Sequence, residues 1–380
     1  MLLLEAHGKQ LLRDAGIAVP DSELVRDPAQ IGLPGFPGPY MVKAQVPVGG
    51  RGKAGGIVKV DDASRLPAAV AQVLATPIKG YRSKAVLVES AVGGAEHYLA
   101  LMVDAGIGKL RLLHSPRGGI EIEGNFAETP GALSLAVPPT PAGSADALAR
   151  LGDRLSGGDR EAVVAVASRL FDCFLRNGLM LAEINPLFVD GGAGRAGDAK
   201  IVVDMNAVPE RPALLRIFED NRDLYPDAWR KLSEGFDYVE IDRAGQIGLV
   251  TTGAGLSMML IDELVAAGGR PINFCDMRTG QMRGKPDRLL RIFDWLQEAG
   301  HLRVVLVNVF AGITDLGEFA ELLLEARRQR PGLRVPFVAR LVGNGAERAR
   351  KLIGEAACGI ELEPDLERAI ARSVALARGV

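Results

Sequence analysis

The chain has 380 residues, of which 48% are hydrophobic and 24% charged, and its formal net charge is −2. This composition is typical of a folded globular protein, and the length predicts two or three domains. The nearly balanced charge provides no general attraction to nucleic acid or to an anionic membrane, so we expect neither as a partner.

The sequence shows no sign of export, membrane insertion or a disulfide framework. Its three cysteines lie far apart and form no CxxC pair, which argues against both disulfides and a zinc site. The N-terminus lacks a cationic segment followed by a long apolar run, and no run of about 18 uncharged apolar residues occurs. We therefore expect a cytoplasmic protein.

A glycine-rich loop between two β-prone runs is the most informative stretch of the first half. Tyr40–Val46 and Ile57–Val60 are β-prone, and the loop between them holds five glycines together with Arg51 and Lys53. Glycine lets backbone N–H groups approach an oxyanion closely, and the cations, with Lys43 on the first run, favour phosphate. The spacing is not that of a Walker loop. We interpret the segment as a flap over a triphosphate, with a mobile basic surface hairpin as the alternative.

Four glutamates follow on further predicted strands. Glu89 ends the β-prone run 85–89, and Glu96 follows the small-residue loop after it. A strand end that opens onto a loop is a common place for a ligand contact, although exposed glutamates are also common without any role. Glu121 and Glu123 alternate with isoleucines and would share one face of a strand, for which a solvated face is the simpler interpretation.

Helical spacing of apolar residues predicts helices over 2–15 and 159–177, the second capped by Asp159 and ended by Gly178.

Two β-prone segments joined by a predicted turn over 190–198 each carry an oxygen ligand, Asn185 on the first and Asp204 at the end of the second. An amide and a carboxylate oxygen on neighbouring strands suit Mg²⁺, whose other positions go to water and phosphate. Glu183, two residues before Asn185, would point to the same side. Asn-Pro also initiates turns and Asp204 could cap a loop, so the spacing alone leaves a structural role open.

From about residue 246 the pattern changes to regular alternation of strands and helices. Strands are predicted over 247–252, 272–275, 304–310 and 335–341, and helices over 256–267, 286–299 and 364–378. This alternation predicts a parallel, doubly wound sheet. Glycine turns after Thr252 and after Phe310 fall at carboxyl ends of strands, where such sheets bind ligands, and each places a helix N-terminus there. We therefore expect a second anion site in this half.

Seven segments, in order and at similar spacing, resemble the β subunit of succinyl-CoA synthetase (succinate–CoA ligase, ADP-forming), an ATP-grasp family. They are VKAQVPVGGRGKAGG, LVES, GGIEIE, AEINPL, TGAGL, LVNVFAGI and ARLVGNGAE. The resemblance covers nearly the whole chain. It implies an α/β fold with an ATP-grasp region over 1–235 and a flavodoxin-like, doubly wound CoA-ligase domain over 245–380. The nucleotide would lie between subdomains formed by 1–20 with 100–235 and by 21–99.

The resemblance also implies roles for individual residues. The phosphates of ATP would be held by Lys43, Gly50, Arg51 and Gly52, and the base and ribose would face Glu89, the backbone near Val92, and Glu96. Asn185 and Asp204 match the family's Mg²⁺ ligands, and Glu183 matches the glutamate that faces a phosphorylated histidine of the partner. In the second domain, the phosphoryl and substrate site would involve Thr252, Gly312, Ile313 and Thr314.

The reaction implied by the resemblance needs a partner. ATP–Mg²⁺ would phosphorylate a histidine of an α subunit, the phosphoryl group would pass to a small carboxylic acid, and CoA would capture the acyl phosphate. The histidine and the CoA site belong to the family's α subunit. The four histidines of this chain lie outside the matching segments, so we expect no autophosphorylation.

Departures from the family pattern cluster in the second domain. Thr252 stands where the family usually has asparagine, and the segments 275–280 and 310–315 differ, the second losing an arginine and gaining Asp315. Arg278 is a candidate replacement for the lost cation. Another acid, such as malate, is therefore an alternative to succinate. Two further alternatives are a self-sufficient ATP-grasp carboxylate–amine ligase and a non-catalytic nucleotide-sensing subunit.

Overall fold

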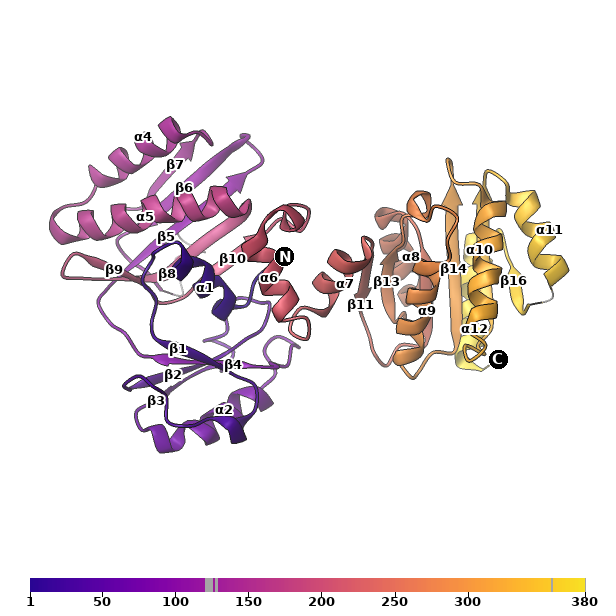
Figure 1. Ribbon diagram of the computed structural model, residues 1–380, viewed down its shortest axis with the longest axis horizontal. Helices are drawn as coiled ribbons and strands as arrows, with labels where there is room; N and C mark the ends of the chain where they lie inside the picture. The colour runs from indigo at the N-terminus through magenta and orange to yellow at the C-terminus, as the bar shows by residue number, and fades with distance from the viewer. Residues whose placement is uncertain (120–125, 127–128, 357, 380) are drawn as a thin grey trace. The chain divides into compact units, whose positions relative to one another are not determined.

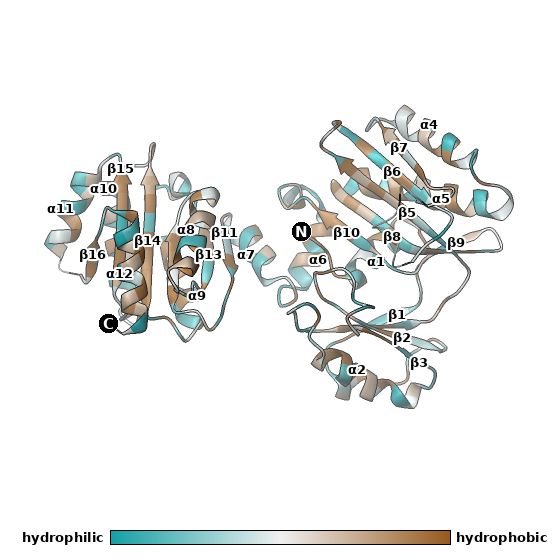
Figure 2. Ribbon diagram, turned by 180° about the vertical axis from the view of Figure 1, so that it is seen from behind, coloured by the Kyte–Doolittle hydropathy of each residue, from teal (hydrophilic) through white to brown (hydrophobic). Residues whose placement is uncertain are grey.

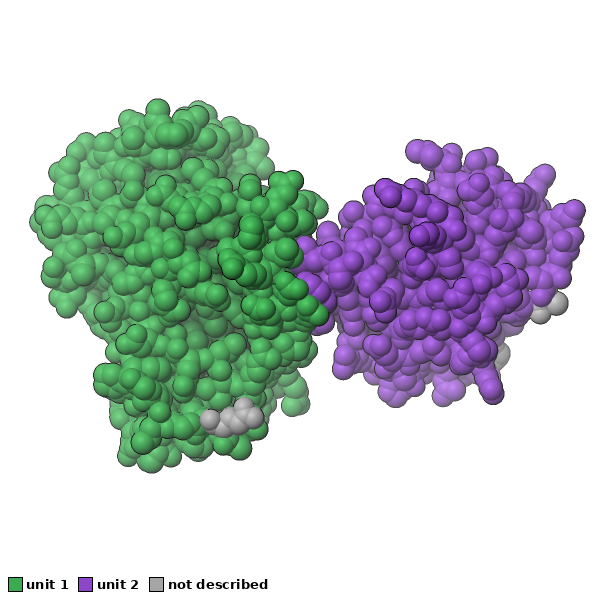
Figure 3. Space-filling model, viewed as in Figure 1, with its two compact units in different colours: residues 1–224 green, residues 225–380 purple. Residues whose placement is uncertain are grey.

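The computed structural model in Figure 1 describes residues 1–119, 126, 129–356 and 358–379. Hydrophobic residues concentrate on its strands, as Figure 2 shows. The chain divides into two compact units, residues 1–224 and 225–380 (Figure 3). This division falls before the expected boundary at 235, because α7 (Pro226–Glu234) packs on β11 (Asp237–Glu240), which pairs with β13 (Asn273–Asp276) of the second unit.

The first unit contains a smaller, four-stranded sheet in the order β1-β4-β2-β3. Its strands are β1 (Ser22–Val25), β2 (Tyr40–Ala44), β3 (Ile57–Val60) and β4 (Val86–Ser90). Apolar side chains of α2 (Leu66–Ala75) pack on this sheet in one buried cluster. The predicted glycine hairpin is confirmed, because β2 and β3 pair antiparallel with Lys43 opposite Ile57.

The larger sheet of the first unit has the order β10-β8-β5-β6-β7, with β9 paired to β8. Its strands are β5 (Ala95–Asp104), β6 (Lys109–Ser115), β7 (Leu133–Val137), β8 (Leu179–Asp190), β9 (Ala193–Ala196) and β10 (Lys200–Val203). The helices that pack on it are α1 (Glu5–Asp14), α4 (Pro141–Gly152) and α5 (Gly157–Asn177) (Figure 1). A short helix, α6 (Pro212–Asp220), follows β10.

The structure tests three of the predictions made for this part of the chain. The predicted Asp159 cap is wrong, because α5 begins at Gly157 and Ser156 occupies the N-cap position. The stop is confirmed, since Gly178 has a left-handed backbone with φ of 59°. The segment 190–198 is predicted as one open turn, but residues 193–196 form strand β9, which pairs with β8. The turn is therefore confined to the residues between these two strands. Glu121 and Glu123 lie outside the described residues.

The second unit is built on a parallel sheet in the order β12-β14-β15-β16. Its strands are β12 (Ile247–Thr251), β14 (Val304–Ala311), β15 (Phe337–Gly343) and β16 (Ile360–Leu362), and its helices are α8 (Ala254–Ala266), α9 (Asp287–Glu298), α10 (Leu316–Gln329), α11 (Ala346–Ala356) and α12 (Leu366–Arg378). One buried cluster joins the sheet to α9, α10 and α11, and another joins it to α8 and α12. Helices therefore cover both faces, which confirms the doubly wound prediction.

The strand β13 lies beside β12 and contacts it through a side chain and an isolated bridge. The side chain of Asn273, fully buried on β13, accepts a hydrogen bond from the Leu249 N–H (2.8 Å) and donates one to the Leu249 carbonyl (2.9 Å). A parallel bridge between Ile247 and Pro271 places β13 beside β12. The ladder of β13 pairs it with β11, but with β13 counted beside β12 the order β13-β12-β14-β15-β16 matches the flavodoxin-like 2-1-3-4-5 arrangement.

In the described part of the chain, every helix is too short or too polar to cross a membrane.

Candidate active site

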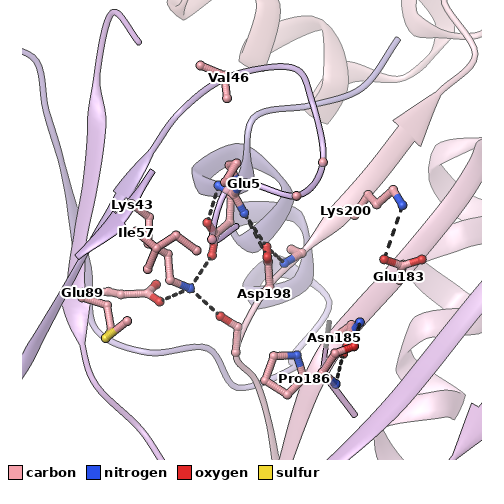
Figure 4. A pocket seen from close by; sticks show the side chains of 18 of the residues that line it. Glu5, Lys43, Val46, Ile57, Glu89, Glu183, Asn185, Pro186, Asp198 and Lys200 are labelled. Carbon is pink, nitrogen blue, oxygen red and sulfur yellow. Dashed lines mark hydrogen bonds and ion pairs between the residues drawn. The ribbon is translucent and has the colours of Figure 1, made fainter. Parts of the chain in front are cut away.

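A cavity of about 360 Å³ opens between the two sheets of the first unit (Figure 4). Most of the residues proposed for nucleotide and metal binding line it, namely Lys43, Gly50, Arg51, Gly52, Glu89, Val92, Glu183 and Asn185. Glu96 and Asp204 are absent from the described residues that line it. Since cavities of this size with a few convergent polar groups are the usual form of a small-molecule site, this is the candidate active site.

Lys43 reaches one wall of the cavity from β2. Its ammonium group lies 2.9 Å from Glu5 Oε1, 2.6 Å from Glu89 Oε1 and 2.9 Å from the carbonyl oxygen of Gly197. Alternation along β2 points Lys43 away from Val42 and Ala44, which pack in the core with α2. The strand therefore fixes a buried cation at the cavity wall.

Arg51 anchors the glycine loop to the same wall. Its guanidinium group lies 2.7 Å from Glu5 Oε2 and 2.9 Å from Asp198 Oδ2, and it donates a hydrogen bond to the Ala44 carbonyl (3.0 Å). Gly50 adopts a left-handed backbone with φ of 76°, a conformation that glycine takes without strain. The loop thus folds back over the cavity. It is held there by two carboxylates from outside the loop, Glu5 on α1 and Asp198 between β9 and β10.

Glu89 does not present a free carboxylate to the cavity. It is 2% exposed, and its two oxygens lie against Lys43 and Lys9, the second at 2.5 Å from the Lys9 ammonium group. The family resemblance predicts that Glu89 faces the base and ribose of a nucleotide. Its contacts give it the position of a charge partner for the lysines.

The pKa values at this wall shift in the direction expected for ion pairs. Burial alone would raise the pKa of Glu5, but the charges of Arg51, Lys43 and Lys9 outweigh it and hold that pKa well below its ordinary value. Burial would lower the pKa of Lys43, yet Glu5, Glu89 and Asp198 together raise it. Burial would also lower the pKa of Arg51, but the charges of Glu5 and Asp198 outweigh burial and raise it, Glu5 more than Asp198. Glu5, Lys43 and Arg51 are therefore charged at neutral pH.

Asn185 lies on the opposite wall, on β8. Its side-chain oxygen accepts a hydrogen bond from the Gly119 N–H (2.7 Å), and its amide group donates one to the Gly119 carbonyl (3.1 Å). Glu183 lines the cavity on the same strand, as predicted. It accepts a hydrogen bond from the Tyr98 hydroxyl (3.0 Å), and its Oε1 lies 3.6 Å from the Lys200 ammonium group.

The carboxylate that joins Asn185 at the cavity is Asp198, and Asp204 lies elsewhere. In the β8–β9 hairpin, Leu187 pairs with Ala196, and the Gly197 N–H donates to the Pro186 carbonyl (2.9 Å). This register brings Asp198 opposite Asn185, and both line the cavity. Asp204 follows the far end of β10, where its carboxylate accepts a hydrogen bond from the Asn206 N–H (2.9 Å). Sequence reasoning missed Asp198 because it placed this residue in the turn.

Glu5 and Lys9 were also missed. They lie one turn apart on α1, and both are buried, Lys9 with 1% exposure. The sequence offers one signal for them, which is that both charged residues fall on the apolar face of an amphipathic helix. Charged residues are rarely buried unless they are paired, so this position indicates that each has a buried partner of opposite charge.

The residues predicted to form a second anion site lie in the second unit, at the carboxyl ends of β12 and β14. Thr252 follows β12, and the Gly253 N–H at the start of α8 donates to Asp276 Oδ1 (2.8 Å). The loop after β14 ends at Thr314, whose hydroxyl lies 3.0 Å from that of Thr279, and Ile313 in this loop is 97% exposed. The two glycine turns therefore occupy the same edge of one sheet, as predicted.

Two of the departures in this unit have structural partners. Arg278 pairs with Asp237 at 3.0 Å, and the same carboxylate also lies 2.8 Å from the Lys231 ammonium group. Asp315 is the N-cap of α10, where its Oδ1 accepts a hydrogen bond from the Glu318 N–H (2.9 Å), and it also lies 3.6 Å from Arg348. The geometry thus gives Asp315 a role in starting a helix.

Comparison with known proteins gives matches to both units. An ATP-grasp domain model matches residues 2–189, and a CoA-ligase model matches residues 250–371. The β subunit of ADP-forming succinate–CoA ligase from Ignicoccus hospitalis is 34% identical over 397 aligned residues, with 100% of both chains covered. The same subunit from Chloroflexus aurantiacus is 35% identical, covering 96% of this chain and 94% of its own.

Among solved structures, ATP citrate lyase from Methanothrix soehngenii, in complex with citrate and coenzyme A, superposes with a TM-score of 0.73. The match covers 100% of this chain and 99% of that chain at 18% identity, so it is evidence for the fold alone.

Proposed function

Because the chain belongs to the family of ADP-forming succinate–CoA ligase β subunits, a group of ligases that form carbon–sulfur bonds, we propose that it phosphorylates a histidine of a partner α subunit with ATP. The phosphoryl group then passes to a small carboxylic acid, and CoA held by the partner captures the acyl phosphate. The main support is the cavity itself, where cations from the smaller sheet face oxygen ligands from the larger one.

The triphosphate is bound between Lys43 and the glycine loop. Lys43 and Arg51 lie at one wall of the cavity, and the backbone of Gly50 and Gly52 lines it beside them. These fixed positive charges stabilise the charge that develops on the β- and γ-phosphates during in-line transfer. Val92 also lines the cavity and is proposed to contact the base, together with Glu96 at the exposed start of β5.

A divalent cation fits beside the phosphates. We assign Asn185 and Asp198 as its protein ligands in place of the Asn185 and Asp204 pair expected from the sequence. An amide oxygen and a carboxylate are hard ligands, and Mg²⁺ bound there would neutralise phosphate charge and orient the triphosphate. Glu183, held by Tyr98, is proposed to face the incoming histidine of the partner.

The second unit is proposed to receive the phosphoryl group at its sheet edge. The N–H groups at the start of α8 and the loop Gly312–Thr314 lie at the carboxyl ends of neighbouring strands, where the positive helix end favours an anion. Thr252 at the same edge is proposed to contact the acid. Succinate is the first acid to test because the relatives are named for it, and malate is the second because this edge departs from the family pattern.

The test is to purify the chain with and without a succinate–CoA ligase α subunit from the same organism. With γ-labelled ATP and Mg²⁺, we expect label on the α subunit's histidine, and with an acid and CoA we expect acyl-CoA and ADP. The chain alone should form neither product. Acyl-CoA formation by the isolated chain would contradict the proposal. ADP release that depends on an amine and not on CoA would favour the amine-ligase alternative, and ATP binding without turnover of any acid would favour the sensing alternative.

A further inference from the structure

Two lysines from different elements share the same three acceptors behind the cavity wall. The ammonium group of Lys9, on α1, lies 2.8 Å from Glu5 Oε1, 2.5 Å from Glu89 Oε2 and 2.9 Å from the Gly197 carbonyl oxygen. Lys43, on β2, contacts the same two glutamates and the same carbonyl. Each ammonium group has three donors, so each is matched to three acceptors.

The two lysines differ in what else they can reach. Lys43 lines the cavity, whereas Lys9 is absent from the described residues that line it and its side chain is 1% exposed. A triphosphate in the cavity can therefore attract Lys43 away from its carboxylates. Lys9 has no route to the ligand and stays with them.

The charges at this wall balance only when Lys9 is included. Three cations (Lys9, Lys43 and Arg51) face three carboxylates (Glu5, Glu89 and Asp198). Without Lys9, two cations would be held by three carboxylates in a buried setting, where an uncompensated charge is costly. The carboxylates would then hold Lys43 more strongly and repel an entering triphosphate.

We propose that Lys9 is a positioning residue for nucleotide binding, which holds Glu5, Glu89 and the Gly197 carbonyl in place so that Lys43 is free to bind the triphosphate. This inference rests on the proposed function, because it requires that the cavity binds ATP. It concerns a residue that has no contact with the ligand and acts through its effect on Lys43.

The first experiment compares Mg–ATP binding by calorimetry for the full chain and for Lys9→Met, which keeps the side-chain length and removes the charge. Lys59→Met is the matched control, since the Lys59 side chain is 59% exposed and its ion-pair partner among the described residues is Asp61, also at the surface. We expect Lys9→Met to bind at least about tenfold more weakly, the effect of losing one charge-assisted interaction. The control should bind as the unchanged chain does.

A second variant separates a charge role from a merely structural one. Glu5→Gln removes one of the three carboxylates, so the double variant Lys9→Met/Glu5→Gln restores the balance with two cations and two carboxylates. We expect the double variant to bind Mg–ATP several-fold more tightly than Lys9→Met. In the chain that retains Lys9, Glu5→Gln should give no such gain. If Lys9 only packs the helix, the second substitution will not restore binding.

Each outcome decides one question. If the unchanged chain does not bind Mg–ATP, the proposed function fails. If it binds but Lys9→Met binds equally well, or the double variant binds no better than the single one, the inference about Lys9 is overturned. Should Lys9→Met fail to fold, the double variant must fold, as judged by its thermal unfolding, and must bind; its failure would also overturn the inference.

Discussion

At the scale of single residues, the charge of Lys43 is fixed by carboxylates that arrive from other elements. Glu5 comes from α1 and Glu89 from β4, and they raise the pKa of Lys43 despite its burial. A lysine that stays charged in a buried wall is prepared to bind phosphate without a change of protonation. Its proposed role in catalysis is electrostatic, namely to stabilise charge that is greater in the transition state than in bound ATP.

We therefore expect Lys43→Met to lower the rate of α-subunit phosphorylation by at least about 100-fold, the range found when one such stabilising group is removed. The measurement is single-turnover transfer of label from γ-labelled ATP to the α subunit. Lys59→Met, at the exposed end of the neighbouring strand β3, serves again as control. Transfer at an undiminished rate in Lys43→Met would exclude Lys43 from the site.

The choice between Asp198 and Asp204 as metal ligand gives a second prediction. Asp198→Asn should raise the Mg²⁺ concentration needed for half-maximal phosphorylation by at least about tenfold, as changes near metal ligands do. Asp204→Asn should leave it unchanged, because Asp204 accepts a hydrogen bond from the Asn206 N–H away from the cavity lining. A Mg²⁺ titration of each variant makes the measurement. The reverse result would restore the pair Asn185 and Asp204.

Residues of the site differ in how far the sequence predicts them. Lys43, Arg51 and Asn185 stand in short patterns whose chemistry is local, namely a glycine loop and an oxygen ligand on a strand, and the structure brings them to one cavity. Lys9 and Asp198 have no such local pattern. Lys9 needs the ion pair between α1 and Glu89 of the smaller sheet, and Asp198 needs the β8–β9 register, which a prediction of an open turn does not contain.

At the scale of secondary-structure elements, Asp315 shows how a departure from a family pattern can be a helix signal. It caps α10 through the Glu318 N–H, and Asp365 caps α12 through the Arg368 N–H, both at 2.9 Å. We expect Asp315→Ala and Asp365→Ala each to lower the free energy of unfolding by about 1 kcal/mol. Acid preference should be the same in both variants, since each loses a cap and a surface ion pair and neither residue is proposed to contact the acid.

The measurement is thermal unfolding together with acyl-CoA formation from succinate and from malate. Asp315→Asn is the control that keeps an N-cap side chain and should retain most of the stability. A change in the ratio of the two acids in Asp315→Ala, without such a change in Asp365→Ala, would show that Asp315 contacts the substrate. That result would return it to the role suggested by its place in the sequence.

Strands β5 and β6 hold a histidine pair that predicts a dependence of stability on pH. His97 and His114 are both buried, with Nδ1 of His97 3.2 Å from Nε2 of His114, and Asp159 lies 3.8 Å from His97. Burial lowers the pKa of His114 from 6.5 to about 4, with the charge of His97 adding to the effect. The folded chain therefore keeps His114 neutral at a pH where the unfolded chain binds a proton.

Because the unfolded chain binds this proton at a higher pH than the folded chain, the free energy of unfolding decreases as the pH falls. The contribution of neutral His114 to stability is complete above pH 6.5 and is lost as the pH falls toward 4. At pH 5 we expect the loss to reach about 2 kcal/mol relative to pH 7, from 1.4 kcal/mol for each pH unit. Denaturant unfolding at both pH values should show a smaller loss in His114→Gln than in the unchanged chain. His301→Gln, at an exposed position, should show the full loss.

Elements with a strong local pattern were predictable, and those defined by tertiary pairing were not. The second unit alternates apolar strands with helices, so its strands β12, β14 and β15 lie within a few residues of the predicted ranges. The strand β11 and the helix α7 were missed, because β11 is short and exists through its pairing with β13. The same pairing explains why the boundary between the units falls before residue 235.

At the scale of the whole molecule, the two units have separate hydrophobic cores. One cluster is built on the smaller sheet of the first unit, and two clusters cover the parallel sheet of the second. All the described residues that line the candidate ATP cavity belong to the first unit, and the residues proposed for the acid site belong to the second. Substitutions in one unit should therefore affect one half-reaction, since sites that share no residues and no partners usually act independently.

The last prediction tests this independence at Thr252. We expect Thr252→Asn, which introduces the residue usual in the family, to shift the preference between succinate and malate, because Thr252 precedes the glycine turn at the start of α8. Phosphorylation of the α subunit should be unchanged, because that step uses the cavity of the first unit. The shift is measured as the ratio of kcat/KM for the two acids, and phosphorylation is measured by single turnover with labelled ATP. Loss of both activities together would indicate damage to the fold or coupling between the units. An unchanged acid ratio with normal phosphorylation would mean that Thr252 does not contact the acid, and the search would then move to the Gly312–Thr314 loop on the neighbouring strand.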